Sequence, residues 1–182
     1  MQYMDDIKQS VRHTLGQVLW THKIHEKQAD IYLERFHCLK ILEIIFSVAA
    51  SAGIITTIFN DTYSIKIMAA VVSVIATCLA AYFSTFDLVK MADVHRKTAA
   101  EIIVARERLI LLLLKIKTQK ISENEAINEY EEIERLITRV YSSAPSTTEA
   151  AVKRARKAMG IHGDNEITNE EINSGLPDNL KE

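Results

Sequence analysis

Hydrophobic and polar positions follow two different patterns along this chain. Residues 41–59 and 67–86 are apolar almost throughout, and Glu43 is the one charged residue among them. A helix rises about 1.5 Å per residue, so each stretch is long enough to cross the ~30 Å hydrocarbon core of a bilayer. A core helix of a soluble protein is the alternative, but such helices seldom stay uncharged for so long. The pattern predicts two antiparallel transmembrane helices joined by the polar turn 60–66.

Outside these stretches, apolar residues recur at helical spacing. Upstream, one face of a helix leading into the first span carries Trp20, Ile24, Ile31 and Cys38. Downstream, a heptad seam alternates at spacings of four and three residues: Met91, His95, Thr98, Ile102, Ala105, Leu109, Leu112 and Ile116. Leu111, Leu113 and Leu114 widen this face. We predict that this seam has more than one partner helix and joins copies of the chain into an oligomer.

Glycine and proline are nearly absent from the long central part of the chain. Between Gly16 and Pro145 there is one glycine, Gly53, and no proline, which is typical of helices. Three capping boxes predict later helix starts, at Ser122 with Glu125, Ser146 with Glu149, and Thr168 with Glu171. The predicted fold class is all-α: an integral membrane two-helix hairpin whose long helices extend into a cytoplasmic helical bundle.

Four regions follow from these patterns. Residues 1–40 form an N-terminal cytoplasmic helix, and residues 41–86 form the hairpin. Residues 87–143 form a cytoplasmic extension of the second span with the following helix, and residues 144–182 form short C-terminal helices and a tail. Lysine and arginine gather in the twenty residues before the first span and in the twenty residues after the second, whereas the turn carries only Lys66. By the positive-inside rule both termini are cytoplasmic.

The remaining composition narrows the function. A net charge of -2 argues against direct nucleic-acid binding by bulk electrostatics. The first thirty residues contain no long apolar run, so we expect no cleavable signal peptide. Cys38 and Cys78 form no C-x-x-C motif and are expected to stay reduced. No nucleophile motif or glycine-rich phosphate loop is present, so we expect no catalytic residues, no cofactor and no enzymatic activity.

Four stretches of the chain, in order, resemble the SLATT-domain family. They are THKIHEKQADIYLERFHCLKI at 21–41, FDLVKMADVHRKTAAEIIVARERLILLL at 86–113, YSSAPSTTEAAVKRARKAM at 141–159 and NEEINSGLPDNL at 169–180. The resemblance implies a two-span effector of a bacterial antiphage system in the inner membrane. The resemblance also implies that the effector stays inactive until a co-encoded sensor, such as a nucleotidyltransferase or a reverse transcriptase, detects phage. Pore formation is what the family is thought to perform.

Two stripes are candidate pore or packing surfaces. On the first span, Glu43, Ser47 and Ser51 follow one another at every fourth residue, and Glu43 is either an interfacial carboxylate near Lys40 or a charged ring at a pore mouth. On the second span, a small and weakly polar stripe comprises Ala69, Ser73, Ala76, Thr77, Ala80 and Ser84. Small residues suit close helix packing, and the same stripe could face water after activation.

Two further clusters are weighed against simpler explanations. The basic residues Lys153, Arg154, Arg156 and Lys157 are either a solvated face, with Glu149 paired to Lys153, or a contact for anionic lipid or phosphate. His22, His25 and the Glu34–His37 pair do not supply the ligands of a di-iron bundle, so no metal is predicted. His95 is expected to be packed or bonded to a partner. A membrane anchor or scaffold that recruits a cytoplasmic defence enzyme is the alternative function.

Overall fold

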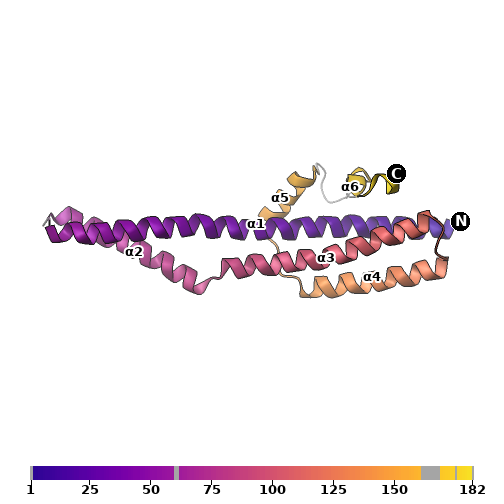
Figure 1. Cartoon of the computed structure of the whole chain (residues 1–182), viewed down its shortest axis with the longest axis horizontal. Helices are drawn as coiled ribbons and strands as arrows, with labels where there is room; N and C mark the ends of the chain where they lie inside the picture. The colour runs from indigo at the N-terminus through magenta and orange to yellow at the C-terminus, as the bar shows by residue number, and fades with distance from the viewer. Residues whose placement is uncertain (1, 60–61, 161–168, 175, 182) are drawn as a thin grey trace. The chain divides into compact units, whose positions relative to one another are not determined.

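The computed structural model describes residues 2–59, 62–160, 169–174 and 176–181. Its helices are α1 (Gln2–Phe59), α2 (Tyr63–Thr85), α3 (Leu88–Lys117), α4 (Glu123–Ser143), α5 (Glu149–Met159) and α6 (Asn169–Ser174), followed by the 3₁₀ turn η1 (Asp178–Leu180) (Figure 1). The described residues contain no strand, so the all-α prediction is confirmed. The chain forms two compact units, one of residues 1–29 and 93–182 and one of residues 30–92.

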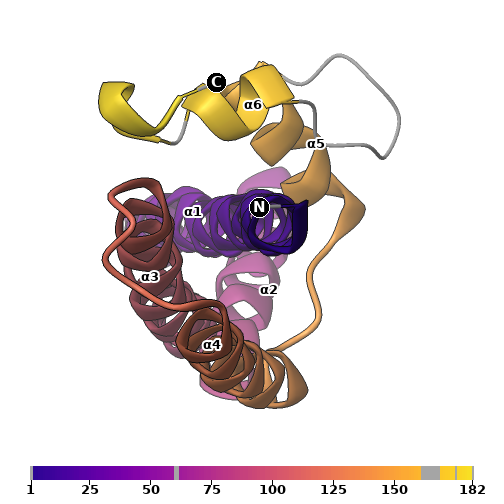
Figure 2. The ribbon, with the colours of Figure 1, turned by 90° about the vertical axis from the view of Figure 1, so that its right-hand side faces the viewer.

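The first unit, residues 1–29 and 93–182, has a hydrophobic core built from three helices and the tail. Helix α1 contributes Ile7, Val11, Leu15 and Val18. Helix α4 contributes Ala126, Ile133, Ile137 and Val140. Helices α3 and α4 lie side by side in Figures 1 and 2. The amphipathic pattern of each helix therefore has its apolar face turned toward a neighbour, as in soluble helical bundles.

The heptad seam of α3 lies in this core. Seven of its eight residues are buried, and Met91 alone is exposed, at 43%. Leu109 and Leu112 are 0% exposed within a single chain. The prediction that this seam joins copies of the chain is therefore wrong, because α1 and α4 of the same chain supply the other members of its core cluster. The seam has more than one partner helix, as expected, but both partners are intramolecular.

The upstream stripe of α1 is only partly buried. Ile24 and Ile31 are 9% and 5% exposed, whereas Cys38 is exposed. The larger contribution to the core comes from Ile7 to Val18, an earlier run at the same helical spacing. The sequence therefore located the helix but placed its buried face too far along the chain.

The second apolar stretch does not continue into α3 without interruption. Helix α2 ends at Thr85, and Phe86 is extended, with φ of -115° and ψ of 109°. The side chain of Asp87 accepts a hydrogen bond of 2.8 Å from the Lys90 amide and so caps the start of α3. The cap satisfies a backbone donor that the broken helix leaves without a partner.

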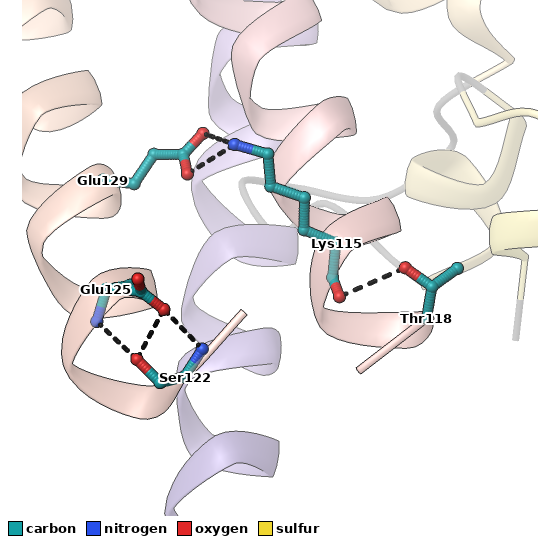
Figure 3. A network of polar contacts seen from close by, with 5 residues as sticks. All are labelled: Lys115, Thr118, Ser122, Glu125 and Glu129. Carbon is teal, nitrogen blue, oxygen red and sulfur yellow. Dashed lines mark hydrogen bonds and ion pairs between the residues drawn. The ribbon is translucent and has the colours of Figure 1, made fainter. Parts of the chain in front are cut away.

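The capping predictions have mixed outcomes. Ser122 and Glu125 form the complete box: the Ser122 amide donates to Glu125 at 3.0 Å, and the Glu125 amide donates to Ser122 at 3.4 Å (Figure 3). Close by, Lys115 on α3 is 2.8 Å from both carboxylate oxygens of Glu129 on α4. The capping box holds the first turn of α4, and the Lys115–Glu129 pair ties α3 to α4 close to it.

The start of α5 differs from its prediction. Its N-cap is Thr148, whose hydroxyl accepts from Ala151, rather than Ser146. The buried Gln28 of α1 accepts 2.8 Å hydrogen bonds from both the amide and the hydroxyl of Thr148, so a tertiary contact selects the cap. Gly160 ends α5 in the left-handed region, at φ 71°, as expected for a helix C-terminus. The box at Thr168 and Glu171 lies outside the described residues.

The C-terminal segment closes the core of the first unit. Ile172, Leu176 and Leu180 are 4%, 5% and 6% exposed. The buried Arg12 of α1 donates to the Leu180 carbonyl at 3.1 Å and to the Asn173 side chain at 2.9 Å. The tail is thus held by both apolar and polar contacts.

Candidate functional site

The hairpin of α1 and α2 is held by a very close approach of two backbones. A Cβ atom added to Gly53 would lie 3.0 Å from the Cβ of Ala69 and 3.4 Å from its Cα. Between residues 41 and 86, the buried residues among those described are Ala50 and Ala69. Lipid tails are as apolar as leucine, so helices in a bilayer associate by close packing of small residues. Gly53, Ala50 and Ala69 supply that contact.

One end of the hairpin carries an ion pair and an aromatic contact. Phe36 on α1 and Phe83 on α2 meet edge to face, with ring centroids 5.7 Å apart. The Lys40 ammonium lies 5.0 Å from the centroid of Phe83 and 2.6 Å from the Glu43 carboxylate. The only charge of the apolar stretches is therefore paired next to the segment's end, which is the arrangement expected of an interfacial carboxylate.

The stripe predicted on α1 does not lie on one contact face. Glu43 is half-buried, whereas Ser47 and Ser51 are exposed. The Ser51 hydroxyl donates to the Ser47 carbonyl at 3.0 Å. A hydroxyl bonded to its own helix needs no water, so an exposed serine is tolerated in hydrocarbon.

The stripe predicted on α2 divides in the same way. Ala69 is buried, Ser73 and Ala76 are half-buried, and the exposed members are Thr77, Ala80 and Ser84. The hydroxyls of Ser73 and Thr77 donate to backbone carbonyls one turn earlier, each at 2.8 Å. The structure thus brings Ala69 against Gly53 of α1, and burial decreases along the stripe toward Ser84. The hydroxyls of Ser73 and Thr77 are therefore satisfied by their own helix.

A histidine pair lies in the core of the first unit. The Nδ1 atoms of His25 on α1 and His95 on α3 are 2.9 Å apart, and the two side chains are 3% and 2% exposed. Burial lowers the pKa of His25 to about 4, helped by His95 and His22, and burial also lowers the pKa of His95. One ring therefore donates and the other accepts, with both rings neutral. His95 is bonded to a partner, as predicted, but sequence reasoning missed that the partner is His25.

Metal ligation has little support in the part of the chain that the structure describes. These residues include no group of three or more histidine, cysteine or carboxylate side chains that could hold an ion. His22 instead lies 3.1 Å from the Ala99 carbonyl. His22 and His25 of α1 thus act as polar contacts with α3. Two neutral rings facing each other can share one proton, and this is the chemistry that the arrangement offers.

The basic cluster lies on the outer side of α5. Lys153, Arg154 and Lys157 are exposed and Arg156 is half-buried, while Ala151 and Ala155 on the opposite side are 0% exposed. The predicted pair of Lys153 with Glu149 is confirmed at 2.8 Å. An exposed pair of this kind contributes little stability, and the cluster keeps a cationic outer face.

Both apolar helices meet the length and composition of a membrane span. The most apolar window of 18 residues is 6% buried in α1 and 0% buried in the stretch that begins with α2. The core helix of a soluble protein would be mostly buried, and these windows are almost entirely exposed. Water does not solvate such a surface favourably, whereas hydrocarbon does.

The comparison with protein families agrees with this geometry. The model of the SMODS and SLOG-associating 2TM effector domain family 4 matches residues 7–171. The matched range contains both apolar helices, the histidine pair and the basic cluster. No curated protein and no solved structure matches the chain. The chain belongs to the SMODS and SLOG-associating 2TM effector domain family 4, the SLATT family of two-span membrane effectors associated with defence systems.

Proposed function

We propose that this chain is a membrane effector of a bacterial antiphage system that assembles into oligomers and permeabilises the inner membrane when a partner sensor activates it. The observation that carries the proposal is the exposed apolar hairpin within a chain of the 2TM effector family. The sensor is a co-encoded protein such as a nucleotidyltransferase or a reverse transcriptase. The chain itself performs no catalysis in this mechanism, because a pore needs assembly rather than a substrate.

The close contact between the two helices of the hairpin supports the proposal that copies assemble before the membrane becomes permeable. Gly53 and Ala69 bring the two helices so close that no water path fits between them at that level. Thr77, Ala80 and Ser84 lie on the exposed side of α2 and are available to line a path between copies. Their small size permits close approach of a second helix, and two of them carry hydroxyls. The cationic face of α5 would then contact anionic headgroups or a phosphate-bearing signal.

The test is membrane depolarisation in cells that express the chain with its sensor. The parent should depolarise the membrane before viable counts fall. Ala80→Leu or Ser84→Leu should abolish depolarisation at equal membrane abundance, because a leucine keeps insertion but blocks the polar path. Ile58→Leu, at a side chain 72% exposed on α1, is the matched control and should behave as the parent. Growth arrest with a polarised membrane would refute the pore and favour a scaffold that recruits a defence enzyme.

Topology has its own test. In a variant lacking Cys38 and Cys78, an impermeant maleimide should label a cysteine at Thr62 from outside intact cells. Cysteines at Ser10 and Ser142, which are both exposed on the first unit, should be labelled only after lysis. Labelling of Ser10 or Ser142 in intact cells would overturn the assignment of both termini to the cytoplasm.

A further inference from the structure

The two helices of the hairpin are not equally close along their length. Their backbones approach most tightly where Gly53 faces Ala69. Toward the C-terminal end of α2, the rings of Phe36 and Phe83 span the distance between the helices, with centroids 5.7 Å apart. Within the unit of residues 30–92, α2 diverges from α1 in that direction (Figure 1). Aromatic rings thus replace glycine and alanine as the bridging groups where the helices separate.

A groove of about 470 Å³ lies along this diverging part of the hairpin, and its volume is typical of a ligand site. It is lined by Leu39 of α1 and by Val74, Ile75, Cys78, Leu79 and Tyr82 of α2. The lining residues of α2 follow one another at spacings of one and three, so they share one face along about 12 Å of helix. A free cysteine behaves as a small apolar residue, so the Tyr82 hydroxyl is the polar group of this lining. The groove is therefore elongated and apolar, with a polar group at one end.

The surroundings of the groove decide what can fill it. Its α2 residues belong to the second apolar stretch, 67–86, and Leu39 lies two residues before the first, 41–59. Atoms that line an empty space lose their dispersion contacts, and water would find too few polar partners in this lining. The flexible apolar group that surrounds a transmembrane hairpin is the acyl chain of a lipid. An acyl chain therefore matches the groove in both shape and polarity.

Groups that suit a lipid headgroup lie at the same end as Tyr82. Arg35 precedes Leu39 by one helical turn, so it lies on the same side of α1, about 6 Å nearer the start of the helix. Arg35 is exposed, whereas Lys40 is already paired with Glu43 at 2.6 Å. A guanidinium group binds phosphate oxygens through two donors, and tyrosine commonly lies at the level of the headgroups.

We infer that this groove binds an anionic phospholipid, with one acyl chain along the face from Val74 to Tyr82 and the phosphate at Arg35 and the Tyr82 hydroxyl. A zwitterionic lipid has the same chains and phosphate, but its headgroup also carries a cation that Arg35 repels. Charge complementarity therefore selects the anionic lipid. This site goes beyond the proposed function, since it holds lipid whether or not copies assemble. It rests only on the two helices crossing a bilayer.

Photo-cross-linking in proteoliposomes tests the site on the full chain. The probe is phosphatidylglycerol with a diazirine in its acyl chain, at a constant fraction of a phosphatidylcholine bilayer. Replacing part of the phosphatidylcholine by unlabelled phosphatidylglycerol should lower attachment to residues 74–82 by about fivefold, because the two anionic lipids compete for one site. Attachment to Met68 and Val71, which do not line the groove, should not change. Attachment to residues 74–82 that is insensitive to the competitor would overturn the inference.

A matched pair of substitutions tests the position of the acyl chain. Val74→Trp places a large side chain in the groove, at a residue 62% exposed, and should lower attachment to residues 75–82 by about fivefold. Val71→Trp adds the same group to the same helix outside the groove, at a residue 53% exposed, and should behave as the parent. Equal attachment in the two variants would refute the groove as the acyl-chain site.

The headgroup is tested by comparing two photoreactive lipids with identical chains. The parent should attach phosphatidylglycerol about fivefold more than phosphatidylcholine, and Arg35→Gln should bring this ratio close to one. Lys66→Gln, which removes a cation at the other end of the hairpin, should keep the parental ratio. A ratio that survives Arg35→Gln, or that falls equally in Lys66→Gln, would refute the assigned headgroup contact. These liposomes contain no sensor, so every outcome is independent of whether the chain forms a pore.

Discussion

The two compact units of this chain treat the same kinds of side chain in opposite ways. In the unit of residues 1–29 and 93–182, leucine and isoleucine fill the interior, and Leu109 and Leu112 are 0% exposed. In the hairpin of residues 41–86, Ile44, Ile58 and other large apolar residues are exposed, and the buried residues among those described are Ala50 and Ala69. The first arrangement suits water, where burial of apolar area stabilises the fold. The second suits a bilayer, where helices associate by close packing because lipid is as apolar as their side chains.

The largest contrast is expected from one substitution made in both units. Leu109→Ala removes a fully buried side chain and should destabilise the first unit by about 2–5 kcal/mol, through lost burial and the cavity left behind. Leu42→Ala, at a side chain 39% exposed on the hairpin, should cost less than about 1 kcal/mol. Urea unfolding in mild detergent, followed by circular dichroism, measures both. Equal losses would refute the distinction between the units.

Acid should weaken the first unit through its histidine pair. His25 titrates near 6.5 when unfolded and near 4 when folded, so the unfolded chain takes up the proton first. The contribution of His25 to the free energy of unfolding is therefore fully present above pH 6.5. It is lost as the pH drops toward 4, by about 3 kcal/mol at most. Thermal unfolding followed by Trp20 fluorescence should show this fall. It should disappear in His25→Leu with His95→Leu and persist in His13→Leu, and a pH-independent parent would refute it.

The close approach at Gly53 predicts a steric effect that is confined to the hairpin. Gly53→Leu places a side chain against Ala69, where the first added carbon already lies at 3.0 Å, and should cost about 1–3 kcal/mol. Ala52→Leu adds the same bulk on an exposed position and should be nearly neutral. The readout is the resistance of the hairpin to SDS titration. If both variants resist SDS equally, the two helices do not meet at Gly53.

The smallest expected effect is at the start of α4. Ser122→Ala removes the hydroxyl that accepts from Glu125 and should destabilise the first unit by about 1 kcal/mol. Asn124→Ala, two residues later and exposed, is the control and should change little. The same urea unfolding resolves the difference. A larger loss for Asn124→Ala would contradict the assigned cap.

Much of the fold could be predicted because its signals are local. The two spans are read from uncharged length, and the box at Ser122 and Glu125 is read from four consecutive residues. The cap at Thr148 could not be read this way, because Gln28, more than a hundred residues earlier, selects it over Ser146. Periodicity shows that a face is covered, but it does not show by which helix.

In the candidate site, too, local features could be predicted from the sequence, whereas contacts between distant residues could not. Of the small stripe predicted on α2, Ala69 lies against Gly53 of α1, and Ser73 and Ala76 are half-buried. Spacing alone could not show that Ala80 and Ser84 are exposed. The partner of His95 was also beyond reach, since His25 lies seventy residues away and nothing local links the two. The pore lining, the anionic contact of α5 and the oligomer remain predictions.

The two chain segments that connect the hairpin to the first unit, α1 and the path from α2 to α3, differ in stiffness. Helix α1 runs from Gln2 to Phe59 as one helix of 58 residues, whereas the return path changes direction at Phe86 between two helices. A continuous helix transmits a twist or an axial push along its length, because every turn is bonded to the next. Two residues outside a helix absorb the same motion by changing a few backbone torsions. The first span therefore follows from a single stiff helix, and residues 86 and 87 are the place where the return path can bend.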